Sequence, residues 1–114
     1  MPPANYGCWG TEAGALQAVI DRLVAGCHPR AIYLFGSRAE GRARPDSDFD
    51  LVVVCDDSVP PAEEAAVYSA LVGLGIGCDV IACTESEFAA VLADPSNSWR
   101  DTWSRARKVH ERAA

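Results

Sequence analysis

Hydrophobic residues recur along the chain with two spacings, one typical of helices and the other typical of strands. From Leu16 to Cys27 they fall three or four positions apart, which predicts a helix with one apolar face. Thr11 is the candidate N-cap of this helix, and Gly26 lies near its end. Three short apolar runs, rich in β-branched residues, predict buried strands. These runs cover residues 31–35, 49–55 and 78–83.

The segments between the predicted strands carry the polar and turn-forming residues of loops and further helices. Residues 38–47 are polar and contain Gly41 and Pro45, which suits a short helix followed by a loop. After residues 56–61, apolar side chains on one face predict a second helix, and this helix is expected to end at the glycines of segment 73–77. The apolar residues on its face are Val67, Ala70, Leu71 and Leu74.

Two more helices are predicted after the third strand. Thr84, with Glu87 three residues later, is the sequence of a capping box for a helix that runs through Leu92. A last helix begins at Ser98, so we expect the C-terminal segment 96–114 to be helical. Its apolar stripe consists of Trp99, Trp103 and Ala106. Strands that alternate with helices predict an α/β domain in which helices cover a small central sheet.

One domain accounts for all 114 residues, with residues 1–10 as an irregular lead-in. The chain is 49% hydrophobic and 23% charged, a composition typical of globular proteins rather than disordered ones. It has no apolar run long enough to span a membrane, no signal peptide at its N-terminus and no C-x-x-C pair among its five cysteines. We therefore expect a cytoplasmic protein whose cysteines are small buried hydrophobic residues.

The net charge of −6 argues against a protein that holds nucleic acid by bulk electrostatics. This total conceals an asymmetry. Segment 96–114 has five basic and two acidic side chains, a local charge of +3, which leaves −9 for residues 1–95. The basic segment could place cations near a phosphate-bearing ligand or an acidic partner. Alternatively, it is a solvated helix face whose cations favour the C-terminal end of the helix dipole.

Two carboxylates stand at the beginning of the strongest predicted strand. Asp48 and Asp50 are two positions apart, so on a strand they point to the same face with Cα atoms about 6.5 Å apart. Carboxylate oxygens are the ligands that Mg²⁺ prefers, together with substrate phosphates. Taken alone, the pair favours a charged strand entry that points to water.

A second motif gives this acidic pair a partner. Gly36-Ser37 follows a predicted strand, where glycine lets a phosphate approach the backbone and serine offers both a hydroxyl and an N–H group to an anion. Asp79 lies near the start of the next strand after the acidic pair. Three carboxylates beside a phosphate-binding turn describe a site for metal-assisted nucleotidyl transfer, in which two metal ions assist an in-line displacement.

The run from Gly36 to Leu51, GSRAEGRARPDSDFDL, resembles the signature of the minimal nucleotidyltransferases of the DNA polymerase β superfamily. Asp79 matches the third acidic residue of that family, and the resemblance covers about residues 15–95. It implies a small mixed sheet flanked by helices. It also implies the roles of the site residues. Gly36 and Ser37 contact the triphosphate, Asp48 and Asp50 bind Mg²⁺, and Asp79 completes the metal site and helps to deprotonate the acceptor.

The chain departs from the family pattern at two places. Glu40 stands where many members have a basic residue, so the resemblance assigns no phosphate contact to this position. Many members also end in a short strand after a glycine-containing turn, and segment 99–114 lacks that turn.

The resemblance implies transfer of a nucleoside monophosphate, AMP from Mg-ATP, to an acceptor. Short members of the family are commonly encoded beside a small helical HEPN protein that is a toxic RNase, and several of them attach AMP to a tyrosine of that toxin. The leading hypothesis is therefore an antitoxin that adenylylates a HEPN-type partner through Asp48, Asp50 and Asp79.

Two other functions stay open. The chain could mask a partner by contact alone, with its basic, tryptophan-bearing C-terminal segment as the interface. It could also transfer AMP to a small molecule such as an aminoglycoside, although such enzymes usually need a further domain to hold the acceptor. Nucleic-acid polymerisation is less favoured, because the acidic body lacks a basic track.

Overall fold

A computed structural model describes residues 3–58 and 64–113. The described chain contains a four-stranded sheet in the order β3-β2-β1-β4. The strands are β1 (Ala31–Phe35), β2 (Phe49–Cys55), β3 (Cys78–Thr84) and β4 (Arg107–Glu111). Strand β1 is antiparallel to both β2 and β4, whereas β2 and β3 are parallel, so the sheet is mixed. This arrangement confirms the predicted class of a small mixed sheet flanked by helices.

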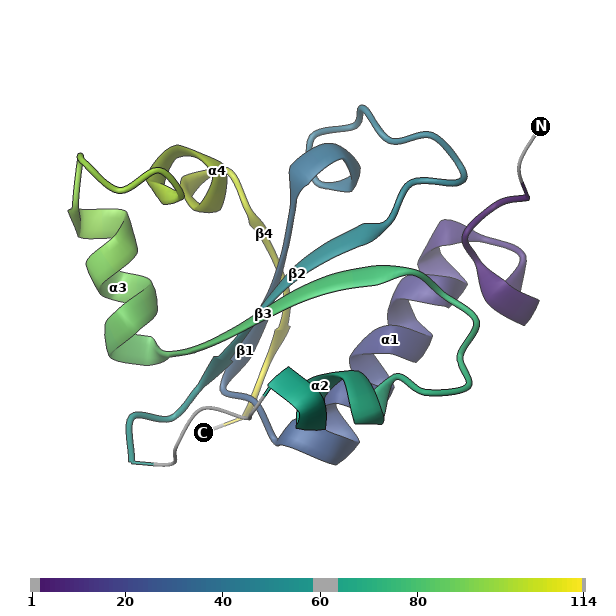
Figure 1. Ribbon diagram of the computed structural model, residues 1–114, viewed down its shortest axis with the longest axis horizontal. Helices are drawn as coiled ribbons and strands as arrows, with labels where there is room; N and C mark the ends of the chain where they lie inside the picture. The colour runs from purple at the N-terminus through teal and green to yellow at the C-terminus, as the bar shows by residue number, and fades with distance from the viewer. Residues whose placement is uncertain (1–2, 59–63, 114) are drawn as a thin grey trace.

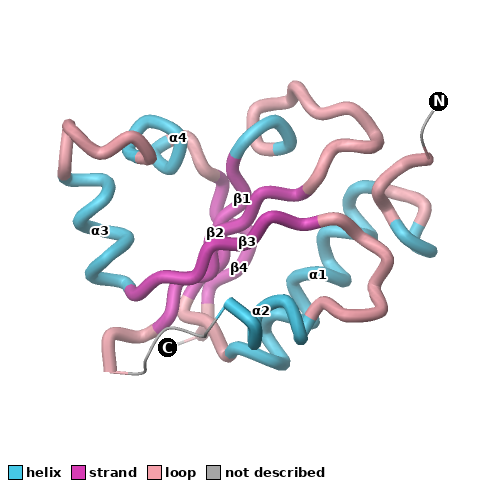
Figure 2. Tube along the Cα trace, in the orientation of Figure 1, coloured by secondary structure: helices cyan, strands magenta, loops and turns pink. Residues whose placement is uncertain are grey.

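Helices cover both faces of this sheet. In Figures 1 and 2, α1 and α2 lie on one side and α3 and α4 lie on the other. These helices are α1 (Glu12–Cys27), α2 (Glu64–Ala70), α3 (Glu85–Ala93) and α4 (Arg100–Ser104). Two short 3-10 turns, η1 (Gly7–Trp9) and η2 (Gly36–Arg38), precede α1 and follow β1.

Each face of the sheet has its own apolar core, because successive side chains of a strand point to opposite faces. Beneath α1 and α2, fully buried residues such as Leu23, Leu34 and Leu51 form the larger cluster. Beneath α3 and α4, a smaller cluster contains Val52 and Trp103 among its buried members. Strand β2 contributes to both cores, which explains why it reads as a nearly continuous apolar run.

Most predicted elements are confirmed. Helix α1 begins after Thr11, whose hydroxyl accepts a hydrogen bond from the Gly14 N–H at 3.1 Å. The strands at 31–35 and 49–55 have the predicted bounds, and the capping box of Thr84 and Glu87 is present. The short helix expected within 38–47 lies earlier, as the turn Gly36–Arg38. Residues 59–61 of the predicted opening of the second helix lie outside the described residues.

The predicted helix of segment 96–114 is confirmed only over α4 (Arg100–Ser104), and its predicted continuation toward the C-terminus is wrong. Helix α4 ends at Ser104, and Arg107–Glu111 forms the edge strand β4. Strand β1 has an unpaired side once β2 has paired with the other, and β4 takes that side, with Ile32 opposite His110. Val109 packs partly buried against the larger core. Pairing with a distant strand overrides the local apolar spacing, which favours a helix.

Candidate active site

The sheet brings the five predicted site residues to one end of the molecule. Asp50 is the register partner of Phe35 on one side and of Asp79 on the other. Gly36 and Ser37 continue directly from Phe35 into the turn η2. The turn predicted to bind phosphate and the third acidic residue therefore flank Asp50, which lies between them.

All three carboxylates belong to the sheet face that α3 and α4 cover. Asp48 and Asp50 are in phase with Val52, a buried member of the smaller core, and out of phase with Phe49. Asp79 is in phase with Cys83 of that same core. Asp48 and Asp79 are exposed, and Asp50 is half-buried between them.

Two glycines make room for these carboxylates. Gly36 has a φ of 73°, and a Cβ atom on it would clash with Oδ2 of Asp50. On the other side of the acidic pair, a Cβ atom on Gly77 would clash with Oδ1 of Asp48. The sequence predicts a phosphate contact for Gly36, whereas the close approach of Asp50 to this residue is not predicted from the sequence. For Gly77 the sequence predicts only the end of a helix, and nothing in it signals the contact with Asp48.

The three acids lie close enough to repel one another. Burial raises the pKa of Asp50, and the negative charges of Asp79 and Asp48 raise it further. The thiol of Cys78 experiences the negative charges of the same three aspartates. Burial, followed by the charges of Asp48, Asp79 and Asp50, raises the pKa of Cys78 to about 12. A divalent cation at this place would relieve the repulsion among the carboxylates.

The donor set fits a cation that is shared with a substrate. Among residues 3–58 and 64–113, no three His, Cys, Asp or Glu side chains lie so that they could hold a metal ion together, so the predicted ligands Asp48, Asp50 and Asp79 do not form a three-ligand site. Mg²⁺ is usually held by one or two carboxylates together with substrate phosphates, rather than by a cage made only of protein. The hard oxygen donors of Asp48 and Asp50 meet that requirement, and the carboxylate of Asp50 lies directly beside Gly36 of the turn η2.

Sequence reasoning missed the role of Arg38, which lies within the quoted motif. Its side chain is buried, and its guanidinium lies 4.2 Å from the centre of the Phe49 ring. It donates to the carbonyl oxygen of Ser47 from Nε at 3.2 Å and from Nη2 at 2.7 Å, and it pairs with Glu12 at 2.9 Å. Arginine is ordinarily exposed, so only the structure reveals that Arg38 holds the loop that leads to Asp48.

The C-terminal segment reaches the same end of the sheet. Glu40 accepts hydrogen bonds from Arg105 at 3.3 Å and from Arg42 at 3.2 Å. The hydrogen bond from Arg42, followed by the charges of both arginines, lowers the pKa of Glu40. Glu40, which departs from the family pattern, therefore holds the guanidinium groups of Arg42 and Arg105 beside the turn η2.

Aromatic side chains line the sheet next to this turn. The ring of Trp99 meets that of Phe35 edge-to-face at 5.8 Å, and it lies 5.9 Å from the ring of Trp103. Trp103 is buried, whereas Trp99 is 43% exposed. The tryptophan stripe is therefore core on one side and exposed surface on the other.

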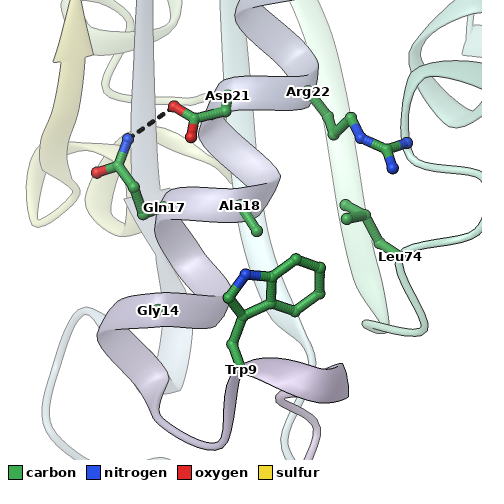
Figure 3. A pocket seen from close by; sticks show the side chains of 7 residues that line it. All are labelled: Trp9, Gly14, Gln17, Ala18, Asp21, Arg22 and Leu74. Atoms are coloured by element: carbon green, nitrogen blue, oxygen red, sulfur yellow. Dashed lines mark hydrogen bonds between the residues drawn. The ribbon is translucent and has the colours of Figure 1, made fainter.

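A pocket of about 390 Å³ lies elsewhere, between α1 and the segment that follows α2 (Figure 3). The exposed Trp9 borders it, together with Asp21, Arg22 and Leu74. It contains none of the five predicted site residues.

In the part of the chain that the structure describes, no helix is long and apolar enough to cross a membrane.

Comparison with known families agrees with the geometry of the acidic site. The family model described as "Polymerase beta, Nucleotidyltransferase" matches residues 17–92, more than half of the chain. The matched stretch contains the turn Gly36-Ser37 and all three aspartates, and it ends before α4 and β4. No curated protein matches the chain. The chain belongs to the polymerase β nucleotidyltransferase family.

Proposed function

We propose that this chain transfers AMP from Mg-ATP to a tyrosine hydroxyl of a HEPN-type toxin and thereby acts as an antitoxin. The observation that carries the proposal is the placement of Asp50. This residue is paired in register with Asp79, and its carboxylate occupies the space that a side chain at position 36 would need. In this proposal, the candidate metal ligands and the candidate phosphate-binding turn therefore meet at one residue.

Each site residue has a chemical task in this proposal. Gly36 allows phosphate oxygens to approach the backbone, and Ser37 donates its hydroxyl and N–H to them. Asp48 and Asp50 supply carboxylate oxygens to the cation. Bound Mg²⁺ neutralises charge on the triphosphate and orients it for attack. Asp79 is exposed beside them, where it can accept the proton of the incoming hydroxyl.

The reaction balances without a further reactant. The acceptor oxygen forms a bond to the α-phosphorus of ATP, and the bond between that phosphorus and the oxygen that bridges to the β-phosphate breaks. Pyrophosphate leaves with the electron pair of the broken bond. The hydroxyl proton passes to Asp79, and Asp48 and Asp50 would be the residues that hold the cation.

The exposed surface beside the site supports a protein acceptor. Trp99 is 43% exposed and packs on Phe35, which directly precedes Gly36. Tryptophan is among the residues that most often dominate protein interfaces. A partner that packs on Trp99 would bring its own hydroxyl group close to the phosphate-binding turn.

The test uses ATP labelled at the α-phosphate, Mg²⁺ and a small helical HEPN-type protein as the candidate partner. We expect label to move to a tyrosine of that protein, and we expect Asp48→Asn/Asp50→Asn to abolish the transfer. Loss of RNase inhibition by the double variant supports catalysis. If the double variant still binds and silences the partner fully, the chain acts by masking. Label found only on a small polar molecule would instead favour that acceptor class.

A further inference from the structure

The N-terminal lead-in joins the two loops that carry the acidic residues into the sheet. The backbone N–H of Asn5 donates to the carbonyl oxygen of Pro45 at 2.8 Å. The Nδ2 atom of Asn5 donates to Ser47 at 3.0 Å and to Gly77 at 2.9 Å, in each case to the backbone carbonyl oxygen. In return, the N–H of Gly77 donates to Oδ1 of Asn5 at 2.6 Å. Ser47 immediately precedes Asp48, and Gly77 stands two positions before Asp79.

The chemistry of these contacts selects asparagine. Both hydrogens of the carboxamide have an acceptor, and its oxygen has a donor, so its hydrogen-bonding groups are all used. Aspartate at this position would keep only the acceptor and would add a negative charge beside two carbonyl oxygens. Glutamine would carry the same amide one methylene further from the backbone.

The clamp that Asn5 forms between the two loops acts close to the carboxylates. Gly77 lies against Oδ1 of Asp48 with no room for a Cβ atom, and its carbonyl oxygen also accepts a hydrogen bond from the Phe49 N–H at 3.1 Å. The carbonyl oxygen of Ser47 is shared by Asn5 and the buried Arg38. A shift of either loop would therefore move the carboxylate of Asp48 relative to that of Asp79.

We propose that Asn5 is a positioning residue that fixes the carboxylate of Asp48, one of the two proposed cation ligands, and thereby sets the affinity for the divalent cation bound with the nucleotide. Like charges at one end of a sheet push the loops that carry them apart, and the hydrogen bonds of Asn5 oppose this movement. Residues that orient metal ligands without touching the metal commonly change metal affinity about 10- to 100-fold when they are replaced. The inference rests on the proposed function.

The test compares Asn5→Ala and Asn5→Asp with Thr11→Ala. Thr11 caps α1, and among the described residues its hydrogen bonds are with α1 alone, so its replacement lowers stability without loosening the clamp. Calorimetry measures ATP binding over a range of Mg²⁺ concentrations and in EDTA. Both Asn5 variants should need about 10-fold more Mg²⁺ for half-maximal binding and bind ATP in EDTA as the wild type does. Thr11→Ala should keep the wild-type requirement for Mg²⁺.

An unchanged Mg²⁺ requirement in the Asn5 variants, or an equal rise in Thr11→Ala, would overturn the inference. If Asn5→Ala does not fold, Asn5→Gln takes its place. Wild-type protein that binds no Mg-ATP would contradict the proposed function instead. Amide exchange then decides the role of Asn5. Faster exchange at Gly77 and Phe49 in the Asn5 variants, but not in Thr11→Ala, supports the clamp, and unchanged exchange refutes it.

Discussion

The guanidinium of Arg38 holds the carbonyl oxygen of Ser47 with two hydrogen bonds, at 3.2 and 2.7 Å, and Ser47 directly precedes Asp48. A buried cation on the α1 side of the sheet thus anchors the loop that delivers a carboxylate to the opposite face. Arg38 lies three positions after Phe35, the last residue of β1, so the phosphate-binding turn and the acidic strand entry are tied together through one side chain.

Replacement of Arg38 should destabilise the fold strongly. Arg38→Ala removes the buried guanidinium, its hydrogen bonds to the carbonyl oxygens of this loop and its ion pair with Glu12, and it leaves a cavity beside the ring of Phe49. We expect the free energy of unfolding to fall by about 3 kcal/mol. Arg38→Lys should lose about 2 kcal/mol, because an ammonium group lacks the planar fork that reaches several acceptors. Urea denaturation measures both losses. Arg42→Ala, at an exposed position in the same segment, is the control and should unfold at the wild-type midpoint.

Alanine at Gly36 should cost more than alanine at Gly41, although both residues have a φ of 73°. Around Gly41, no described atom lies within 4 Å of the place that a Cβ atom would take, so Gly41→Ala costs only the backbone strain of about 1 kcal/mol. Gly36→Ala also displaces Asp50, which should add about 1–3 kcal/mol and abolish the binding of Mg-ATP. Chemical denaturation and calorimetry measure the two effects.

The pair of variants isolates the contact between Gly36 and Asp50. In an Asp50→Ala background, the extra cost of Gly36→Ala over Gly41→Ala should disappear, since the clashing oxygen is gone. An extra cost that persists in this background would show that Gly36 is needed for another reason.

Neutralising Asp50 should stabilise the protein and inactivate it. Its pKa is raised in the folded state, so the group contributes stability that is present below the unfolded-state pKa of about 3.9 and lost as the pH rises through the folded-state value. Asp50→Asn should therefore raise Tm by about 3 °C at pH 7 and by less at about pH 4. Scanning calorimetry at both pH values measures this difference.

The same variant should lose the rise in Tm that Mg-ATP causes in the wild type, because it lacks a ligand to the cation. Asp46→Asn changes an exposed acid in the same loop and should match the wild type in Tm and in its response to Mg-ATP. A wild-type response to Mg-ATP in Asp50→Asn would remove Asp50 from the metal site.

Much of the fold is predictable because it is encoded locally. The strands at 31–35 and 49–55 are apolar runs bounded by polar residues, and the pattern predicts both with the observed bounds. Strand β4 escapes prediction because Arg107–Glu111 contains a single apolar residue, Val109. Its conformation depends on the free side of β1, more than 70 residues earlier in the chain, which no local pattern records.

The residue types of the site are predictable, but the residues that hold the site loops in place are not. Gly36-Ser37 and the three aspartates stand out by type and spacing. Arg38 and Asn5 act through tertiary contacts, and their types are ordinarily exposed, so nothing in the sequence separates them from surface residues. The parallel pairing that places Asp50 beside Asp79 likewise follows from topology rather than from local sequence.

Reversing the charge of Glu40 should strengthen nucleotide binding. Glu40 pairs with Arg105 and Arg42 beside the turn η2, and both arginines are about half exposed or more, so these ion pairs should add little to stability. Glu40→Lys removes a negative charge from the approach to the phosphate-binding turn and frees both guanidinium groups.

We expect Mg-ATP to bind about fivefold more tightly at low salt, with Tm unchanged and with the gain reduced at high salt. Calorimetry at two salt concentrations measures the gain. Glu111→Lys, which makes the same change of charge on the edge strand β4, is the matched control, and an equal gain there would mean that net charge alone is responsible.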